Sequence, residues 1–250
     1  MTPEERRKRG SSFGPAAGLY DRVRPTYPAE AVAWALEPLG PGRHRVADIG
    51  AGTGIMTRVL LALGHDTVAV EPDAQMRHQL SSAARVEAIA GSAESLPLLD
   101  ADVDAAVAAQ SYHWFDPERA HPELARVVRR GGVFAAIWND RDESVAWVNE
   151  YTEIIEGDRG QQDHGPDIVP AFGNLFGPVE SAQFRHSGSH TPDSLVALLQ
   201  SRSYFLTASA QRQASLVARV RALAASHPDL AGRDEFDLPY VTLVFRAIRR

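Results

Sequence analysis

The sequence predicts an α/β fold built on a mostly parallel, doubly wound sheet, and two observations carry this prediction. Strand-like apolar segments alternate with helix-periodic segments between residues 45 and 138. A glycine-rich turn, Gly50 to Gly54, lies directly between the first of these strands and the helix that follows it. A strand joined through a helix to the next strand is a βαβ unit, and such units build Rossmann-like parallel sheets with helices on both faces.

Helix and strand signals follow one another in a regular order along the chain. Residues 1–18 are polar and contain Gly, Ser and Pro, so we expect a flexible N-terminal arm followed by a single domain over residues 19–250. Apolar residues recur at helical spacing after Pro28, which predicts one helix before the first strand. Apolar and β-branched runs predict strands at residues 45–49, 67–71, 86–90, 103–109, 132–138, 179–185 and 240–248. Helical periodicity predicts further helices at residues 52–63, 73–84, 117–129, 143–156, 192–204 and 208–226.

The stretch from Gly157 to Pro178 interrupts this alternation. It is rich in Gly, Pro and Asp and has weak periodicity, which is typical of an irregular insertion or a lid. In open parallel sheets, ligands bind at the carboxyl ends of the strands, where the strand order reverses. The loops that follow the strands are therefore the places to search for chemistry.

The composition excludes several classes of function. The 250 residues include no cysteine, so thiolate zinc sites, iron–sulfur clusters and cysteine nucleophiles are ruled out. The longest apolar runs, such as Val133 to Trp138, are far shorter than the roughly 20 residues of a membrane span. The formal net charge of −6 argues against a nucleic-acid partner, and the basic start at residues 6–9 is followed by no apolar stretch of the kind found in a secretory signal. We expect a cytoplasmic protein, monomeric or homodimeric, that binds no membrane and no nucleic acid.

The glycine-rich turn predicts a binding site for an adenosine-type cofactor. Glycines after a strand allow a ligand to approach the N-terminus of the next helix, whose free N–H groups attract electronegative atoms. The second predicted strand ends at Glu71, about 20 residues after Gly50, which is the offset at which an acidic side chain meets ribose hydroxyls. Both features lie inside one βαβ unit, and this context makes the prediction specific.

Charge indicates which cofactor the turn holds. A dinucleotide-binding turn reads G-x-G-x-x-G, but this chain has Ile55 at the last of these positions. Asp48 would repel a pyrophosphate, whereas a cofactor with an ammonium group and a sulfonium suits a carboxylate. A phosphate-binding P-loop is excluded because the sole lysine is Lys8. A nicotinamide-dependent oxidoreductase stays the alternative enzyme, and a cofactor-binding module without turnover is the non-enzyme alternative.

Four segments resemble the class I S-adenosylmethionine-dependent methyltransferases, in particular their type 11 small-molecule branch. These are VADIGAGTG, VAVEPDAQM, the GSAE turn and QSYHWFD, which begin at residues 46, 68, 91 and 110. The resemblance implies S-adenosylmethionine as cofactor, a seven-stranded sheet with a reversed last strand, and a lid insertion at about 141–178 and 188–236 around the acceptor. It implies that the cofactor contacts Tyr20, Arg24, Asp48, Gly50, Ala51, Gly52, Glu71, Pro72, Met76, Ser92, Ala93, Glu94 and Gln110. The family commonly has Asp where this chain has Ser92, so the bond to the adenine amino group passes to Glu94 or to the backbone.

Residues after the fourth and fifth strands are the candidates for contact with a small-molecule methyl acceptor. His113 is the candidate general base, with packing beside Trp114 as the structural alternative. Tyr112 and Trp114 either face a cation or an aromatic acceptor or belong to the core. Asn139, Arg141 and Arg202 are further candidates, since arginine can bind a carboxylate through two hydrogen bonds. We therefore expect an oxygen acceptor.

No metal site is predicted. His186 and His190 have the spacing of metal ligands, but the glutamate of a zinc-binding helix is missing and Gly188 lies between them.

Overall fold

A computed structural model describes residues 17–84, 86, 88–156 and 170–250. The expected arm at residues 1–18 lies outside the described residues except for positions 17 and 18, which begin helix α2 (Ala17–Val23). Much of the expected irregular segment, residues 157–169, also lies outside them.

The strands form one mixed seven-stranded sheet of order β3-β2-β1-β4-β5-β7-β6. Their bounds are β1 Arg45–Ile49, β2 Asp66–Val70, β3 Ala88–Ile89, β4 Val103–Ala109, β5 Val128–Arg141, β6 Glu180–His190 and β7 Phe236–Ile248. Strands β1 to β5 pair in parallel, and β7 is antiparallel to both of its neighbours. The predicted fold class is confirmed. The strand order reverses between β1 and β4, so a ligand site is expected at their carboxyl ends.

The prediction of one helix before the first strand is wrong, because α2 precedes α3 there; the other long helices lie close to their predicted positions. The helices after α2 are α3 Ala29–Leu36, α4 Ile55–Ala62, α5 Ala74–Ala84, α6 Pro117–Val127, α7 Ala146–Glu156, α8 Pro192–Gln200, α9 Ser203–Leu206 and α10 Ala210–Ser226, with short 3-10 helices η2 Glu37–Leu39 and η3 Tyr112–Trp114. The single helix predicted at 192–204 is wrong in one respect, because α8 ends before Ser201 and α9 starts separately.

Three strands are longer than predicted because they pair with distant parts of the chain. β5 continues to Arg141, which pairs with Tyr240 of β7. β6 continues to His190, which pairs with Phe236, the first residue of β7. The added residues of β6, such as Ser187 and Ser189, are polar and alternate in exposure, so they show no apolar run. Pairing with β7 makes these residues part of the sheet.

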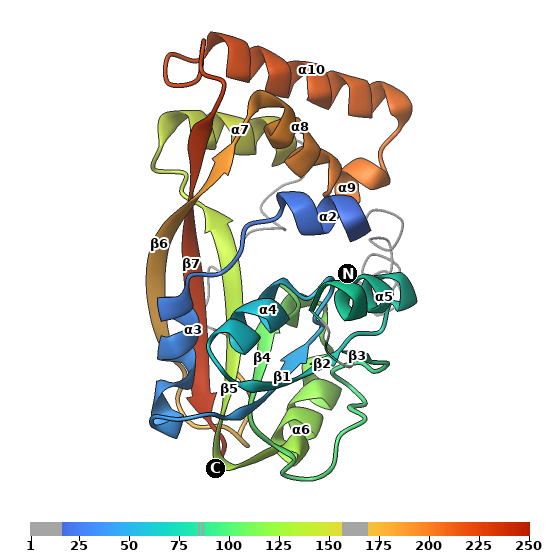
Figure 1. Ribbon diagram of the computed structural model, residues 1–250, viewed down its shortest axis with the longest axis vertical. Coiled ribbons are helices and arrows are strands. Elements are labelled where there is room, and N and C mark those ends of the chain that lie inside the picture. Colours follow the sequence, from blue (N-terminus) through green and yellow to red (C-terminus); the bar gives the residue numbers. More distant parts are fainter. Residues whose placement is uncertain (1–16, 85, 87, 157–169) are drawn as a thin grey trace.

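Alternate strand residues pack on opposite faces of the sheet. Ala105 and Val133 belong to the core under α3 and α4, whereas the neighbouring Ala106 and Phe134 belong to the core under α6. The strands are thus buried on both faces, which explains their near-continuous apolar sequence. Helices α7, α8, α9 and α10 lie beyond the carboxyl ends of β1 and β4, with α2 between them and the sheet (Figure 1). These helices have a hydrophobic core of their own.

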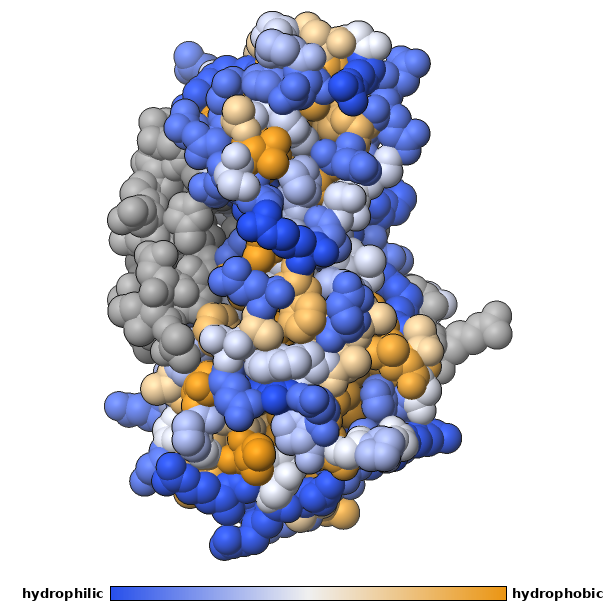
Figure 2. Space-filling model, turned by 90° about the vertical axis from the view of Figure 1, so that its left-hand side faces the viewer, coloured by the Kyte–Doolittle hydropathy of each residue, from blue (hydrophilic) through white to orange (hydrophobic). Residues whose placement is uncertain are grey.

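The edge strand β6 has a polar exposed side. Gln183 and Arg185 are among its exposed residues, and the face on this side of the molecule carries mostly hydrophilic side chains with hydrophobic ones scattered among them (Figure 2). Charged and polar edge residues discourage pairing with further strands. Among the described residues, no helix is long and apolar enough to cross a membrane.

The segment after the undescribed residues is anchored by two aromatic side chains. Phe172 and Phe176 are 2% and 1% exposed, and the Phe172 ring centroid lies 4.6 Å from that of Phe134. The expected irregular insertion therefore ends on the sheet.

We predict that Phe172→Ala lowers the free energy of unfolding by about 3–5 kcal/mol, because it leaves a cavity among well-packed rings. Leu175→Ala is the matched control in the same segment. Leu175 is 43% exposed, so its loss is expected to change stability by at most about 0.5 kcal/mol. Urea denaturation followed by circular dichroism measures both values. Equal losses for the two variants would contradict the anchoring role of Phe172.

Candidate active site

The glycine turn joins β1 to α4 and leaves open space at one position. Gly50 and Gly52 have φ angles of 69° and 57°, a region that favours glycine. A Cβ atom on Gly50 would lie 2.7 Å from the Ser111 Cβ, whereas a Cβ atom on Gly52 would meet nothing within 4 Å. Gly50 therefore permits close packing of the loops, and Gly52 keeps the space beside the turn free for a ligand.

Glu71, directly after β2, lies against this turn as predicted. Its Oε2 atom accepts a hydrogen bond from the Gly52 N–H at 2.9 Å, and its Oε1 atom accepts one from the Asp73 N–H at 2.8 Å. The side chain is buried, and burial raises the pKa of its carboxyl group. Two backbone donors hold the carboxylate in one orientation beside the open space.

Asp48 is a fully buried carboxylate that is only half satisfied. It is 0% exposed. Thr57 Oγ1 donates a hydrogen bond of 2.6 Å to its Oδ2 atom, while Oδ1 has no hydrogen-bond partner. Burial raises the pKa of Asp48 to about 7, and the nearby charge of Glu71 acts in the same direction. A buried acceptor without a donor is costly, so Oδ1 is suited to a ligand that brings a hydrogen-bond donor or a positive charge.

The other predicted cofactor residues follow β2 and β3. Met76 and Ala93 are buried, and Pro72 is exposed. Glu94 Oε1 accepts a hydrogen bond of 2.9 Å from the Asp116 N–H, which ties this loop to the start of α6. Ser92 and Ser95 pair through their backbones in an isolated antiparallel β-bridge. Glu94 thus has a structural task in addition to the contact with the adenine edge that we expect from it.

The loop after β4 is fastened to both neighbouring strands. Gln110, at a φ angle of 53°, donates through Nε2 to the Asn139 carbonyl at 2.8 Å. Ser111 Oγ donates to the Ile49 carbonyl at 2.6 Å. Sequence reasoning placed Ser111 in the segment after the fourth strand but gave it no role, and it missed Thr57. Thr57 could have been found from the sequence, because it is a polar residue on the buried side of the helix that follows the turn.

The three aromatic candidates of η3 differ in their surroundings. Tyr112 lies in the aromatic core beside Phe172, and its hydroxyl is 2.9 Å from His121 Nε2. Burial raises the pKa of Tyr112 to about 12. His113 is exposed, and its ring centroid lies 4.6 Å from that of Trp114. This geometry favours the packing alternative for Tyr112 and His113.

The candidates at the end of β5 hold elements together. Asn139 Nδ2 donates to the Thr26 carbonyl at 2.9 Å, and its Oδ1 atom accepts from Thr242 Oγ1 at 2.6 Å. Arg141 Nε donates to Thr152 Oγ1 of α7 at 2.8 Å. Asn139 therefore fixes the segment after α2 against the sheet, and Arg141 connects the sheet to α7.

Arg24, at the end of α2, connects that helix to the loop after α8. Its Nε atom donates to Ser201 Oγ at 3.1 Å and its Nη2 atom donates to the Ser201 carbonyl at 3.2 Å. Its guanidinium carbon lies 4.6 Å from the centroid of the Tyr20 ring. The structure thus brings Tyr20, Arg24 and the neighbourhood of Arg202 together above the sheet.

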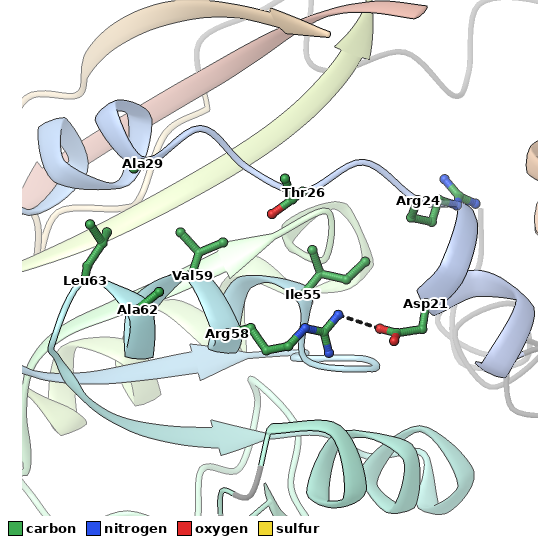
Figure 3. Close-up of a pocket in the computed structure, with 9 residues that line it drawn as sticks. All are labelled: Asp21, Arg24, Thr26, Ala29, Ile55, Arg58, Val59, Ala62 and Leu63. Atoms are coloured by element: carbon green, nitrogen blue, oxygen red, sulfur yellow. Dashed lines mark hydrogen bonds and ion pairs between the residues drawn. The ribbon is translucent and has the colours of Figure 1, made fainter. Parts of the chain in front are cut away.

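A pocket of about 510 Å³ lies beside this region, between α4 and the segment 24–29 (Figure 3). Asp21 and Arg58 form an ion pair of 2.6 Å at one end of it, and Val59 and Leu63 belong to its apolar wall. Its lining includes neither the glycine turn nor Glu71. This pocket is therefore distinct from the site at the carboxyl ends of β1 and β2.

Comparisons with known proteins place this geometry in context. Residues 47–136 match a family described as a methyltransferase domain. An uncharacterized methyltransferase of Mycobacterium tuberculosis is 44% identical over 243 residues, which cover 97% of this chain and 97% of that protein. A malonyl-[acyl-carrier protein] O-methyltransferase of Methylococcus capsulatus is 34% identical over 143 residues, 54% of this chain and 52% of that protein. A solved structure from Anaeromyxobacter dehalogenans, described as a type II methyltransferase, matches with a TM-score of 0.61 at 26% identity and covers 90% of this chain and 97% of that one.

We predict that Asp48→Asn stabilises the ligand-free protein by an amount that grows as the pH rises from about 4 to about 7. In the unfolded chain the carboxyl group ionises near its ordinary pKa of 3.8, whereas burial holds the folded pKa at about 7. Between these values the folded state keeps a proton that the unfolded state has lost, so folding of the wild type becomes less favourable as the pH rises. The asparagine side chain does not ionise, so the variant does not lose stability in this way as the pH rises.

Urea unfolding of both proteins between about pH 5 and pH 8 measures the difference in their free energies of unfolding. The difference is expected to level off above the folded pKa, where both states are ionised. A difference that stays constant over the whole range would contradict the raised pKa.

Proposed function

The chain belongs to the class I S-adenosylmethionine-dependent methyltransferases, and from the geometry of its site we propose that it transfers the methyl group of S-adenosylmethionine to an oxygen atom of a small molecule. The observation that carries the cofactor part of this proposal is the unpartnered Oδ1 atom of Asp48, fully buried beside an open glycine turn. A cationic cofactor with an ammonium group offers this atom both a donor and a counter-charge.

The residues at the carboxyl ends of β1 and β2 fit such a cofactor. Asp48 would take its ammonium end directly or through water, and Glu71 would accept hydrogen bonds from the ribose hydroxyls. Gly52 leaves room for the cofactor to approach the backbone, since a Cβ atom at this position would meet nothing within 4 Å. Met76 and Ala93, both buried, supply apolar surface for an adenine ring.

Bound there, S-adenosylmethionine supplies an activated methyl carbon. In the transfer an oxygen–carbon bond forms while the carbon–sulfur bond breaks, and the sulfonium becomes a neutral thioether. The protein contributes mainly by positioning the reactants and excluding water. Ser111 and Gln110 hold the loop after β4 against β1 and β5, so the acceptor has a fixed wall on that side.

Two observations support a small oxygen acceptor. The relative from Methylococcus capsulatus is named an O-methyltransferase, and Arg141 lies at the carboxyl end of β5. The net charge of −6 does not favour a nucleic-acid substrate.

Isothermal titration calorimetry with S-adenosylhomocysteine tests the cofactor assignment, and transfer of labelled methyl groups to a metabolite extract tests turnover. Binding of NADH without any heat from S-adenosylhomocysteine would reject the proposal in favour of an oxidoreductase. Cofactor binding without transfer to any member of a broad panel of acceptors would favour a module without turnover.

We predict that Glu71→Gln weakens the binding of S-adenosylhomocysteine by about 1–3 kcal/mol, roughly 5- to 150-fold, because buried hydroxyls lose a charged acceptor. The matched control is Asp66→Asn, at the opposite end of β2, where the carboxylate is 47% exposed. Calorimetry should show the control within a factor of two of the wild type. Equal affinity of Glu71→Gln and the wild type would show that Glu71 does not bind the ribose hydroxyls.

We predict that His113→Ala keeps turnover within a few-fold of the wild type. His113 is exposed and packs on Trp114, and an ionised oxygen acceptor needs no general base. Steady-state rates across pH provide the measurement. A loss of about 100-fold together with a change in the pH profile would show instead that His113 takes a proton from the acceptor.

A further inference from the structure

Arg24, Arg202 and Tyr240 form a cluster above the carboxyl ends of the central strands, here called the arginine–tyrosine cluster. Arg24 comes from the end of α2, Arg202 from the loop between α8 and α9, and Tyr240 from β7. Arg24 is hydrogen-bonded to Ser201, the residue next to Arg202. Tyr240 pairs in the sheet with Arg141, the last residue of β5. The cluster therefore lies between the helices α7 to α10 and the sheet, on the acceptor side of the site.

Two donors in this cluster are buried and unused. The Nε atom of Arg202 and the hydroxyl of Tyr240 are inaccessible to solvent and have no hydrogen-bond partner. Tyr240 is only 1% exposed. Buried donors are nearly always paired in folded proteins, because an unpaired one costs about 1–3 kcal/mol. A ligand that accepts hydrogen bonds would remove this cost.

The cluster also holds positive charge that the described part of the chain does not balance. Within that part, no carboxylate lies at ion-pair distance from Arg24 or Arg202. Burial lowers the pKa of Arg24 to about 10, and the like charge of Arg202 acts in the same direction. Burial raises the pKa of the Tyr240 hydroxyl, against the opposing effect of Arg202, Arg141 and Arg24. The charges of Arg202, Arg141 and Arg24 all act on the buried Tyr240 hydroxyl.

We infer that the methyl acceptor is a small organic acid, one carboxylate of which binds to Arg202 and Tyr240 with Arg24 beside them. A carboxylate offers two acceptor oxygens and one negative charge, and so matches two unused donors in a positive environment. This inference rests on the proposed function, because it names the substrate class of that site.

The anchored carboxylate is not the group that receives the methyl. Charge-assisted hydrogen bonds to a guanidinium withdraw electron density from its oxygens and make them poorer nucleophiles. The acceptor therefore carries a second oxygen group, such as another carboxylate, that attacks the methyl carbon while the carbon–sulfur bond breaks. No proton moves when this second group is already ionised.

S-adenosylmethionine also has a carboxylate, and this group is the other carboxylate that could bind to Arg202 and Tyr240. The resemblance described above counts Arg24 and Tyr20 among the residues that contact the cofactor, and it implies that they lie near this carboxylate. Arg202 and Tyr240 belong to the loop after α8 and to β7, far along the sheet from the glycine turn, which follows β1. This separation favours the acceptor as the ligand of Arg202 and Tyr240.

Calorimetry on protein saturated with S-adenosylhomocysteine tests the inference. The probes are succinate, glutarate and tricarballylate, each with its corresponding amide as a neutral control. We expect acids to bind and amides not to bind. Arg202→Gln should weaken acid binding by about 10-fold or more, and Tyr240→Phe by several-fold. Both variants should keep the wild-type affinity for S-adenosylhomocysteine within about twofold, which also shows that they fold.

Arg221→Gln is the matched control. Arg221 lies on α10 among the same helices, is 58% exposed and pairs with Asp193, so its loss should not change acid binding. Binding of no acid to the saturated wild type would overturn the inference while leaving the proposed function intact. A weaker affinity of Arg202→Gln for S-adenosylhomocysteine with unchanged acid binding would assign the cluster to the carboxylate of the cofactor. Failure of the wild type to bind S-adenosylhomocysteine would instead reject the proposed function itself.

Discussion

The buried carboxylate of Asp48 is the constraint on which the rest of the site depends. It lies one residue before the end of the central strand β1, has no exposed surface, and has one hydrogen bond from Thr57 for two oxygens. Such an arrangement destabilises the ligand-free protein whenever the carboxyl group is ionised. The surrounding structure must therefore be stable enough to hold it. The sheet provides this stability, because strands buried on both faces pack between α3 and α4 on one side and α6 on the other.

Charge is distributed unevenly over the carboxyl edge of the sheet. The ends of β1 and β2 carry Asp48 and Glu71, whereas Arg141 ends β5 and Arg24 is hydrogen-bonded to Ser201, the residue before Arg202. In the proposed reaction, a cationic donor and an anionic acceptor would therefore be attracted to opposite sides of one site. This arrangement would orient the two reactants before the bond between them forms, and positioning is the main contribution that a protein makes to a displacement at an activated carbon.

Local patterns predicted the positions of β1, the glycine turn and β2 well, and non-local pairing explains what they missed. β1, the glycine turn, β2 and Glu71 lie within about 30 residues, and periodicity with turn chemistry was enough to place them. Ser111 could not be assigned in this way, because its partner Ile49 is 62 positions away. The arginine–tyrosine cluster joins residues from α2, the α8–α9 loop and β7. Only Arg24 and Arg202 were candidates from sequence, and Tyr240 was predicted merely as part of a strand.

Helix α2 connects the two sides of the site. Its Asp21 forms an ion pair of 2.6 Å with Arg58 of α4, the helix that starts at the glycine turn, and Arg24, just after it, is hydrogen-bonded to Ser201 beside Arg202. Asn139 holds the following segment to β5 through the Thr26 carbonyl. A change in the position of α2 would thus alter the surroundings of the donor and of the acceptor together.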